Sequence, residues 1–219
     1  MKRLCLAFVS LAALAGAAAA ADLPPAPAPY YKAPAMVPVY SWTGFYVGIN
    51  GGGGFGSSSW TTTNSFNVSG GQFGGTAGYN YQFGQGVIGI EGDIDWSDIK
   101  GSTVVGCPTT CTTSDSWMGT VRGRLGYAAD RFMPFVSGGL AFGDIKAAVP
   151  GFAGATQTNA GWTVGAGLEF AIAGNWTAKA EYLYVDLGNF NCGLNCGVLT
   201  NNNVAFHTNL VRGGINYRF

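Results

Sequence analysis

Hydrophobic and polar side chains alternate with a period of two from residue 42 to the end of the chain, and this is the period of a β-strand. Eight stretches carry the pattern, each of roughly the ten residues that a tilted strand needs to cross a membrane. In each stretch one face is apolar, while the other carries glycine, polar or charged residues. The stretches are "FYVGINGGGGF", "QFGGTAGYNYQF", "VIGIEGDIDW", "WMGTVRGRLGY", "FVSGGLAF", "WTVGAGLEF", "WTAKAEYLY" and "LVRGGINYRF".

The links between these stretches differ in length. Tight turns, "GQG", "AADR" and "AGN", join the second stretch to the third, the fourth to the fifth and the sixth to the seventh. The other four links are long and polar, and they span residues 57–71, 97–115, 144–160 and 186–203. This alternation is typical of outer-membrane barrels. We therefore predict an all-β fold, an eight-stranded antiparallel up-and-down transmembrane β-barrel with short periplasmic turns and long extracellular loops.

The positions of the aromatic residues distinguish this barrel from a soluble, lipocalin-like one, which would turn its apolar face inward. Membrane barrels place aromatic rings at the two lipid–water boundaries. Seven rings of the apolar face lie at the long-loop ends and form a predicted outer belt: Phe55, Phe73, Trp96, Trp117, Phe142, Trp162 and Tyr184. Seven more lie at the tight-turn ends and form a predicted periplasmic belt: Phe45, Phe83, Tyr127, Phe170, Trp176, Tyr217 and Phe219.

The composition agrees with a membrane location. Charged residues make up only 10% of the 219 residues, and the formal net charge is zero. So few charges would leave a soluble protein with a poorly soluble surface. A neutral chain also lacks the basic surface that nucleic acid requires, so we expect no nucleic-acid partner.

The N-terminal region predicts an exported protein of the Gram-negative outer membrane. A short positive segment precedes an apolar core, and an alanine run then offers A-x-A cleavage after Ala20 or Ala21. Residues 1–20 are therefore interpreted as a signal peptide, and a retained membrane helix is disfavoured because the apolar core is short. Six prolines within residues 21–41 predict an extended periplasmic linker, which leaves residues 42–219 for the barrel.

If the apolar face meets lipid, the polar face lines the interior of the barrel. Charges in a narrow lumen must be paired or hydrated, and eight strands leave an interior just wide enough for side chains or one small ligand. We therefore predict that a paired network of five acids and five bases fills the lumen, with a narrow diffusion channel as the alternative. The network residues are Glu91, Asp93, Asp95, Arg122, Arg124, Glu169, Lys179, Glu181, Arg212 and Arg218.

Four cysteines remain after processing, and all of them lie in predicted extracellular loops of an exported protein. Disulfides are therefore expected, and four cysteines allow three pairings. The local pairs Cys107–Cys111 and Cys192–Cys196 are favoured because a tight turn can bring such close positions together. A pairing across the two loops stays open, while the spacing and the compartment disfavour a metal site.

The sequence predicts no catalytic residue, no cofactor and no metal site, and hence a non-enzymatic protein. His207, the single histidine, would need partners that sequence spacing does not reveal to act in a hydrolase or to bind an iron porphyrin. A polar residue at the membrane boundary is therefore the favoured interpretation. The "GGGGFG" run fits a dinucleotide-binding pattern only formally, because no helix follows it.

Three segments, "WTGFYVGINGGGGFG", "AEYLYVDLG" and "VRGGINYRF", behind an "ADLP" start, resemble the small alphaproteobacterial outer-membrane β-barrel proteins. That group is similar to opacity-type and OmpA-type barrels, and it includes surface antigens and some haemin-binding members. The resemblance implies an eight-stranded barrel with both ends in the periplasm. It also implies that Tyr217 and Phe219 belong to the signal that the barrel-assembly machinery reads.

Together these features predict a barrel that contributes to envelope integrity and presents loops at the cell surface. The expected partners are outer-membrane lipid and lipopolysaccharide, the barrel-assembly machinery and an extracellular ligand. Three other functions stay open: a surface protein that binds haemin or a host ligand, a narrow porin-like channel and, as the least favoured, an outer-membrane enzyme.

Overall fold

The computed structural model describes residues 40–61, 65–107, 109–196 and 203–219, apart from the side chains of residues 190 and 196. The predicted signal peptide, and the predicted linker as far as residue 39, lie outside this part of the chain, so both stay predictions. No helix in the described part is long and apolar enough to cross a membrane.

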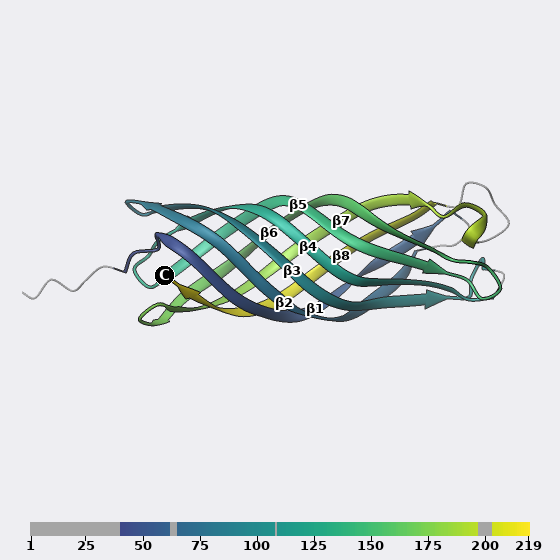
Figure 1. Ribbon diagram of the computed structural model, residues 1–219, viewed down its shortest axis with the longest axis horizontal. Coiled ribbons are helices and arrows are strands. Elements are labelled where there is room, and N and C mark those ends of the chain that lie inside the picture. The colour runs from purple at the N-terminus through teal and green to yellow at the C-terminus, as the bar shows by residue number, and fades with distance from the viewer. Residues whose placement is uncertain (1–39, 62–64, 108, 197–202) are drawn as a thin grey trace, which may run out of the picture. The chain divides into compact units, whose positions relative to one another are not determined.

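Eight antiparallel strands form a closed barrel in the order β1 to β8, and β8 pairs with β1 to complete it (Figure 1). This confirms the predicted fold class. A short 3-10 helix, η1 (Gly193–Cys196), lies between β7 and β8. The strands are β1 (Gly44–Trp60), β2 (Phe66–Phe83), β3 (Gly86–Thr103), β4 (Cys111–Tyr127), β5 (Phe132–Ala148), β6 (Ala155–Ala173), β7 (Trp176–Asn191) and β8 (Asn203–Arg218).

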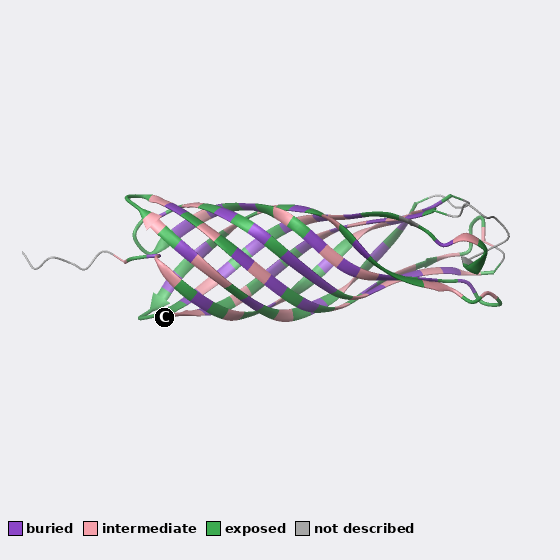
Figure 2. Cartoon of the chain, turned by 45° about the horizontal axis from the view of Figure 1, so that its top comes forward, coloured by how far each residue is buried: buried purple, intermediate pink, exposed green. Residues whose placement is uncertain are grey.

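Side chains alternate along each strand between the lumen and the outer surface, which Figure 2 shows as alternating bands of burial. In β8, Val211 and Ile215 are 54% and 47% exposed on the outer surface, whereas Arg212 is buried inside. The apolar outer face would contact the hydrocarbon of a membrane, as the alternation predicted.

Aromatic rings gather at both boundaries of this apolar face. In the outer belt, the ring centroids of Phe73 and Trp96 are 5.6 Å apart on neighbouring strands. In the periplasmic belt, Trp176 packs edge-on against Tyr217 at 5.1 Å, and Tyr217 packs against Phe219 at 5.3 Å. Figure 1 places the C-terminus at the end of the barrel that carries the tight turns, so the last ring lies in the periplasmic belt.

On the extracellular side, the strands continue beyond the ends that the apolar pattern predicts. Strand β7, for example, runs to Asn191, whereas its predicted stretch ends in the outer belt. Above that belt the polarity of the two faces is reversed: Val185 and Leu187 are fully buried inside, while Asp186 is partly exposed outside. The outer face meets water there, so the pattern of a membrane strand ends although the strand itself goes on.

Gly54 explains part of the glycine run in β1. A Cβ atom at this position would lie 2.8 Å from Leu210 Cδ2 and 3.2 Å from Ile99 Cγ1, which is closer than packed carbon atoms approach. The missing side chain therefore lets Leu210 and Ile99 pack directly against the backbone of β1 inside the barrel.

Candidate functional site

Three layers of buried side chains lie inside the barrel, and the middle layer is charged. Its nine charged residues come from β3, β4, β6, β7 and β8, and each is at most 4% exposed. We call this layer the charge cluster: Glu91, Asp93, Asp95, Arg122, Arg124, Glu169, Lys179, Glu181 and Arg212.

Arg122 lies at the centre of the charge cluster. Its Nη2 atom is 2.6 Å from Glu91 Oε1 and 2.7 Å from Asp93 Oδ2, and its Nη1 atom is 2.9 Å from Glu181 Oε2. The guanidinium also donates to hydroxyl groups of β4 and β5 at 2.9 Å and 3.2 Å. All five N–H donors of this side chain therefore have acceptors.

Arg212 extends the charge cluster toward the seam between β8 and β1. It contacts three carboxylates, those of Asp95 at 2.6 Å, Glu181 at 2.8 Å and Asp93 at 2.9 Å. Asp93 and Glu181 thus each bind both Arg122 and Arg212, so that the two guanidinium groups share acceptors from β3 and β7.

Arg124 and Lys179 form the periplasmic side of the charge cluster. Arg124 is 2.7 Å from Glu169 and 3.2 Å from Glu91, and it donates to the hydroxyl of Tyr46 at 2.8 Å. Tyr46 in turn donates to Glu91 Oε2 at 2.7 Å. Lys179 Nζ lies 2.9 Å from the same carboxylate. Glu91 therefore accepts from several donors at once, as a buried carboxylate requires.

The charge cluster holds five carboxylates and four cationic groups, so its formal charge is 4 − 5 = −1. Each of the five carboxylates lies within ion-pair distance of at least one cation. Removing one partner from such a buried network leaves a charge without compensation, which costs about 3–5 kcal/mol. The side chains consequently support one another, and the cluster acts as a single connected unit.

The extracellular layer of the interior is apolar, which the sequence analysis did not predict. It lies above the charge cluster, where the inward positions of the strands carry aliphatic and aromatic residues. The signal was present in the inward Leu183 and Leu210, but most members lie in segments that were interpreted as loops. We call this layer the outer core: Trp60, Phe66, Val68, Ile99, Cys111, Met118, Ala141, Ile145, Ala147, Val149, Leu183, Val185, Leu187, Cys192, Val204, Phe206 and Leu210.

A third layer of buried side chains lies at the periplasmic end of the lumen. Trp42, just before β1, is only 1% exposed, and its Nε1–H donates to the carbonyl of Asp130 at 3.0 Å. Its backbone N–H donates to Gln82 Oε1 at 2.7 Å, which fixes the chain at the entry to the first strand. We call this layer the periplasmic cluster: Trp42, Val87, Ala128, Met133 and Ala171, with Tyr40 packed against it.

Arg218, which was predicted to join the charge network, lies instead at the periplasmic mouth. Its guanidinium donates to the carbonyl of Ser41, and its Cζ atom lies 4.3 Å from the centre of the Tyr40 ring. The physical reason is that Arg218 lies next to the chain end, on the periplasmic side of the layer that holds Arg212. The other nine predicted network residues are the nine members of the charge cluster.

Of the two predicted local disulfides, Cys107–Cys111 is confirmed, with a Cα–Cα distance of 5.9 Å. Cys192 is buried in the outer core, whereas the side chain of Cys196 lies outside the described part, so the second pair stays a prediction. His207 lies above the outer belt, where its Nε2 atom is 2.8 Å from the Oγ atom of Ser57.

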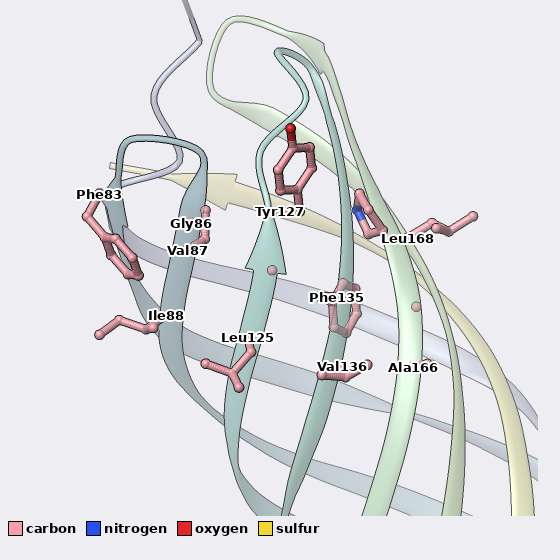
Figure 3. Close-up of a pocket in the computed structure, with 13 residues that line it drawn as sticks. Phe83, Gly86, Val87, Ile88, Leu125, Tyr127, Phe135, Val136, Ala166 and Leu168 are labelled. Atoms are coloured by element: carbon pink, nitrogen blue, oxygen red, sulfur yellow. The ribbon is translucent and has the colours of Figure 1, made fainter.

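The outer surface carries an apolar hollow of about 720 Å³ near the tight turns (Figure 3). Leu125, Val136 and Leu168 line it together with the aromatic rings of Phe83 and Tyr127, and no charged residue takes part. It offers contact with acyl chains and lacks any group for chemistry or for binding a metal.

Comparison with known proteins places the chain among membrane barrels. A family model described as "Outer membrane protein beta-barrel domain" matches residues 6–219. The 31 kDa outer-membrane immunogenic protein of Brucella melitensis is 42% identical over 215 residues, which cover 86% of this chain and 89% of that protein. The 25 kDa outer-membrane immunogenic protein of Brucella canis is 33% identical over 223 residues, which cover 100% of this chain and 99% of that protein.

A 22 kDa outer membrane protein of Rhizobium leguminosarum is 35% identical over 189 residues, which cover 83% of this chain and 80% of that protein. Among solved structures, Neisserial surface protein A is similar with a TM-score of 0.48 and 15% sequence identity, over 81% of this chain and 98% of that one. The match to the family model and the identity with the Brucella and Rhizobium proteins lead to one conclusion: the chain belongs to the outer-membrane β-barrel family and is a protein of the Gram-negative outer membrane.

Proposed function

We propose that the protein is a sealed barrel that contributes to the integrity of the outer membrane and presents its extracellular rim at the cell surface. One observation carries this proposal: the outer core, the charge cluster and the periplasmic cluster follow one another along the lumen. A solute that crosses the barrel would have to pass all three layers. A narrow pore, by contrast, needs a continuous path of wetted groups.

The energetics of two layers support the sealed state. A hydrated ion that enters the charge cluster would have to displace at least one buried ion pair, at a cost of about 3–5 kcal/mol. Such a barrier slows passage by a factor of roughly 10² to 10⁴, because each 1.4 kcal/mol is a factor of ten. The outer core adds an apolar constriction, and apolar constrictions exclude both ions and water.

Two observations support presentation of the rim at the cell surface. The strands extend beyond the outer belt, where partly exposed polar side chains such as Ser59 and Asp186 replace the lipid-facing ones. The Brucella relatives are named immunogenic outer-membrane proteins. The rim of this barrel would then be the part that meets antibodies or other extracellular partners.

The proposed partners within the envelope are lipid, lipopolysaccharide and the barrel-assembly machinery. The two aromatic belts and the apolar face between them support contact with lipid. Phe219, which is 72% exposed and packs edge-on against Tyr217, is accessible to a factor that recognises the C-terminal strand before the barrel closes. Its role as an assembly signal stays a prediction.

Osmotic swelling of liposomes tests the proposal. Liposomes that contain the folded full-length protein should swell in solutions of small sugars no faster than protein-free liposomes. A matched variant, Arg122→Ala, should also stay closed, because the outer core and the periplasmic cluster remain in place. Swelling of the parent that depends on sugar size would contradict the sealed barrel and support the narrow channel.

A further inference from the structure

Four polar residues lie side by side on the outer surface, in one row across four neighbouring strands. Asp186 of β7 is the register partner of His207 of β8, His207 is the partner of Ser57 of β1, and Ser57 is the partner of Asn67 of β2. Direct partners in an antiparallel sheet have Cβ atoms about 4.5–5.5 Å apart. The barrel thus assembles an acid, an imidazole, a hydroxyl and an amide in order, although the outermost two are separated by more than a hundred residues of chain.

The central pair of this row is hydrogen-bonded in the manner of a nucleophile and its base. Ser57 Oγ lies 2.8 Å from His207 Nε2. When the imidazole proton is on Nδ1, the hydroxyl donates to Nε2, which is the arrangement in which a histidine can remove the serine proton. The ring of Tyr184 packs against the imidazole at 6.4 Å between centroids, so the histidine is held from a second side.

A groove of about 520 Å³ opens beside this pair on the outer surface. Phe55 supplies an apolar wall, while Asn67, Ser69 and Asn209 supply polar groups. Ser57 lies two residues beyond Phe55 of the outer belt, which is about 7 Å along a strand. The hydroxyl is therefore at the level where acyl chains of outer-leaflet lipids join their polar headgroups.

We propose that Ser57 and His207 form a hydrolytic site for carboxylic esters that link acyl chains to outer-leaflet lipids. This inference goes beyond the sealed barrel, because the site lies on the outer surface and needs no open lumen. It departs from the expectation that the protein is not an enzyme. The substrate class follows from the height of the hydroxyl, from the apolar wall that Phe55 gives the groove and from the absence of charged groups in its described lining.

The reaction is an acyl transfer to serine followed by hydrolysis. Ser57 Oγ attacks the ester carbonyl carbon while its proton passes to His207 Nε2, and the C–O bond to the lipid alcohol breaks as the imidazolium gives that proton to the leaving oxygen. Water then attacks the acyl–serine ester with the same histidine as base, which releases a fatty acid and restores the hydroxyl. Asn67, the register partner of Ser57, is the group placed to donate to the oxyanion.

Asp186 is a positioning residue in this arrangement. Its Oδ1 atom accepts a hydrogen bond from the backbone N–H of Gly188 at 2.8 Å, which anchors the carboxylate beside the histidine strand. Catalytic hydrogen bonds are commonly long or misaligned without substrate and tighten when it binds. A carboxylate on this side of the imidazole favours the tautomer with the proton on Nδ1.

Covalent labelling with a fluorophosphonate tests the nucleophile. The folded full-length protein in detergent micelles should form an adduct that mass spectrometry assigns to Ser57, and Ser57→Ala should abolish it. The matched control is Ser59→Ala, two residues along the same strand, where the hydroxyl bonds to Ser65 at 2.6 Å and not to a histidine. This variant should label like the parent. An unlabelled parent, or labelling that persists in Ser57→Ala, would overturn the proposal.

Hydrolysis of p-nitrophenyl laurate in mixed micelles tests the activity. Ser57→Ala and His207→Ala should each lower the rate by about 100-fold or more, while both keep the β-sheet circular dichroism and the thermal transition of the parent. Asp186→Asn should lower kcat while leaving KM for the ester unchanged, because the carboxylate orients the histidine and does not contact the substrate. Equal rates in the parent and in Ser57→Ala would refute the site.

Phospholipid and lipid A in separate micelles then distinguish the two sources of the ester by fatty-acid release. Release from neither lipid would also refute the proposal.

Discussion

Replacement of Arg122 by methionine removes the central cation of the charge cluster and is expected to destabilise the folded barrel strongly. Arg122 is fully buried and contacts Glu91, Asp93 and Glu181 within 2.9 Å. Methionine keeps much of the side-chain length but supplies no N–H donor. The substitution changes the formal charge of the cluster from −1 to −2 in a place that water does not reach.

The magnitude follows from the partners that remain. Glu91 keeps Lys179, while Asp93 and Glu181 keep Arg212, so no carboxylate loses every cation. The cost should therefore be that of one broken buried pair, about 3–5 kcal/mol, and not three times that value. Since whole domains are stable by only about 5–15 kcal/mol, this is a large share.

Urea unfolding of the barrel in lipid micelles, followed by tryptophan fluorescence, measures this change. The matched control is Lys100→Met, which breaks the exposed Lys100–Asp98 pair above the outer belt, where the side chains are 61% and 77% exposed. That pair should contribute less than about 1 kcal/mol. The double variant Arg122→Met/Glu181→Gln restores a formal charge of −1 and should recover part of the lost stability. If Arg122→Met unfolds like Lys100→Met, mutual pairing does not stabilise the lumen and the reasoning is refuted.

Three further perturbations test the other layers of the barrel. Trp42→Ala empties the periplasmic cluster and should lower the free energy of unfolding by about 3–5 kcal/mol; an unchanged urea midpoint would argue against a packed periplasmic closure. Asp115 lies above the outer belt with its carboxyl buried, and burial, aided by the charge of Asp144, raises the pKa of Asp115 to about 7. Because the unfolded pKa is near 4, the folded state retains a proton that the unfolded state has lost, so stability should fall as the pH rises from about 4 to about 7. The urea midpoint of Asp115→Asn should lack this fall, and parallel pH profiles of parent and variant would contradict the assignment. Reduction of Cys107–Cys111 should lower the free energy of unfolding by roughly 2 kcal/mol, the entropy of a short closed loop, without opening the barrel; a melting temperature unaffected by reductant would show that the disulfide leaves stability unchanged.

The parts of the fold that lipid dictates were predictable from the sequence. Contact with hydrocarbon requires an apolar residue at every second position, so the period of two revealed the strands and the direction of Val211 and Ile215. The same constraint sends polar side chains into the lumen, so the charges of Glu91 and Arg122 could be assigned to the interior. Rings such as Trp96 marked the boundaries because their amphipathic character suits an interface.

The parts above and below the membrane were less accessible, because lipid imposes no pattern there. The sequence analysis missed the outer core. Ile145 and Val185 point inward there, but the outward residues beside them are polar. These segments therefore lack the apolar outer face of a membrane strand, and their sequence resembles that of a loop. Trp42 precedes the strands, and nothing in its local sequence shows that it folds into the lumen. The pairing of Ser57 with His207 depends on the strand register across 150 residues of chain, which alternation alone does not determine.

Single-channel recording in planar lipid bilayers tests the central claim of a sealed lumen most directly. We predict that insertion of the folded parent protein produces no steady conductance steps in about 1 M potassium chloride, a concentration that strongly screens charge interactions. Reproducible, voltage-independent openings of uniform size in the parent would contradict it, because such openings require a continuous aqueous path through the outer core, the charge cluster and the periplasmic cluster.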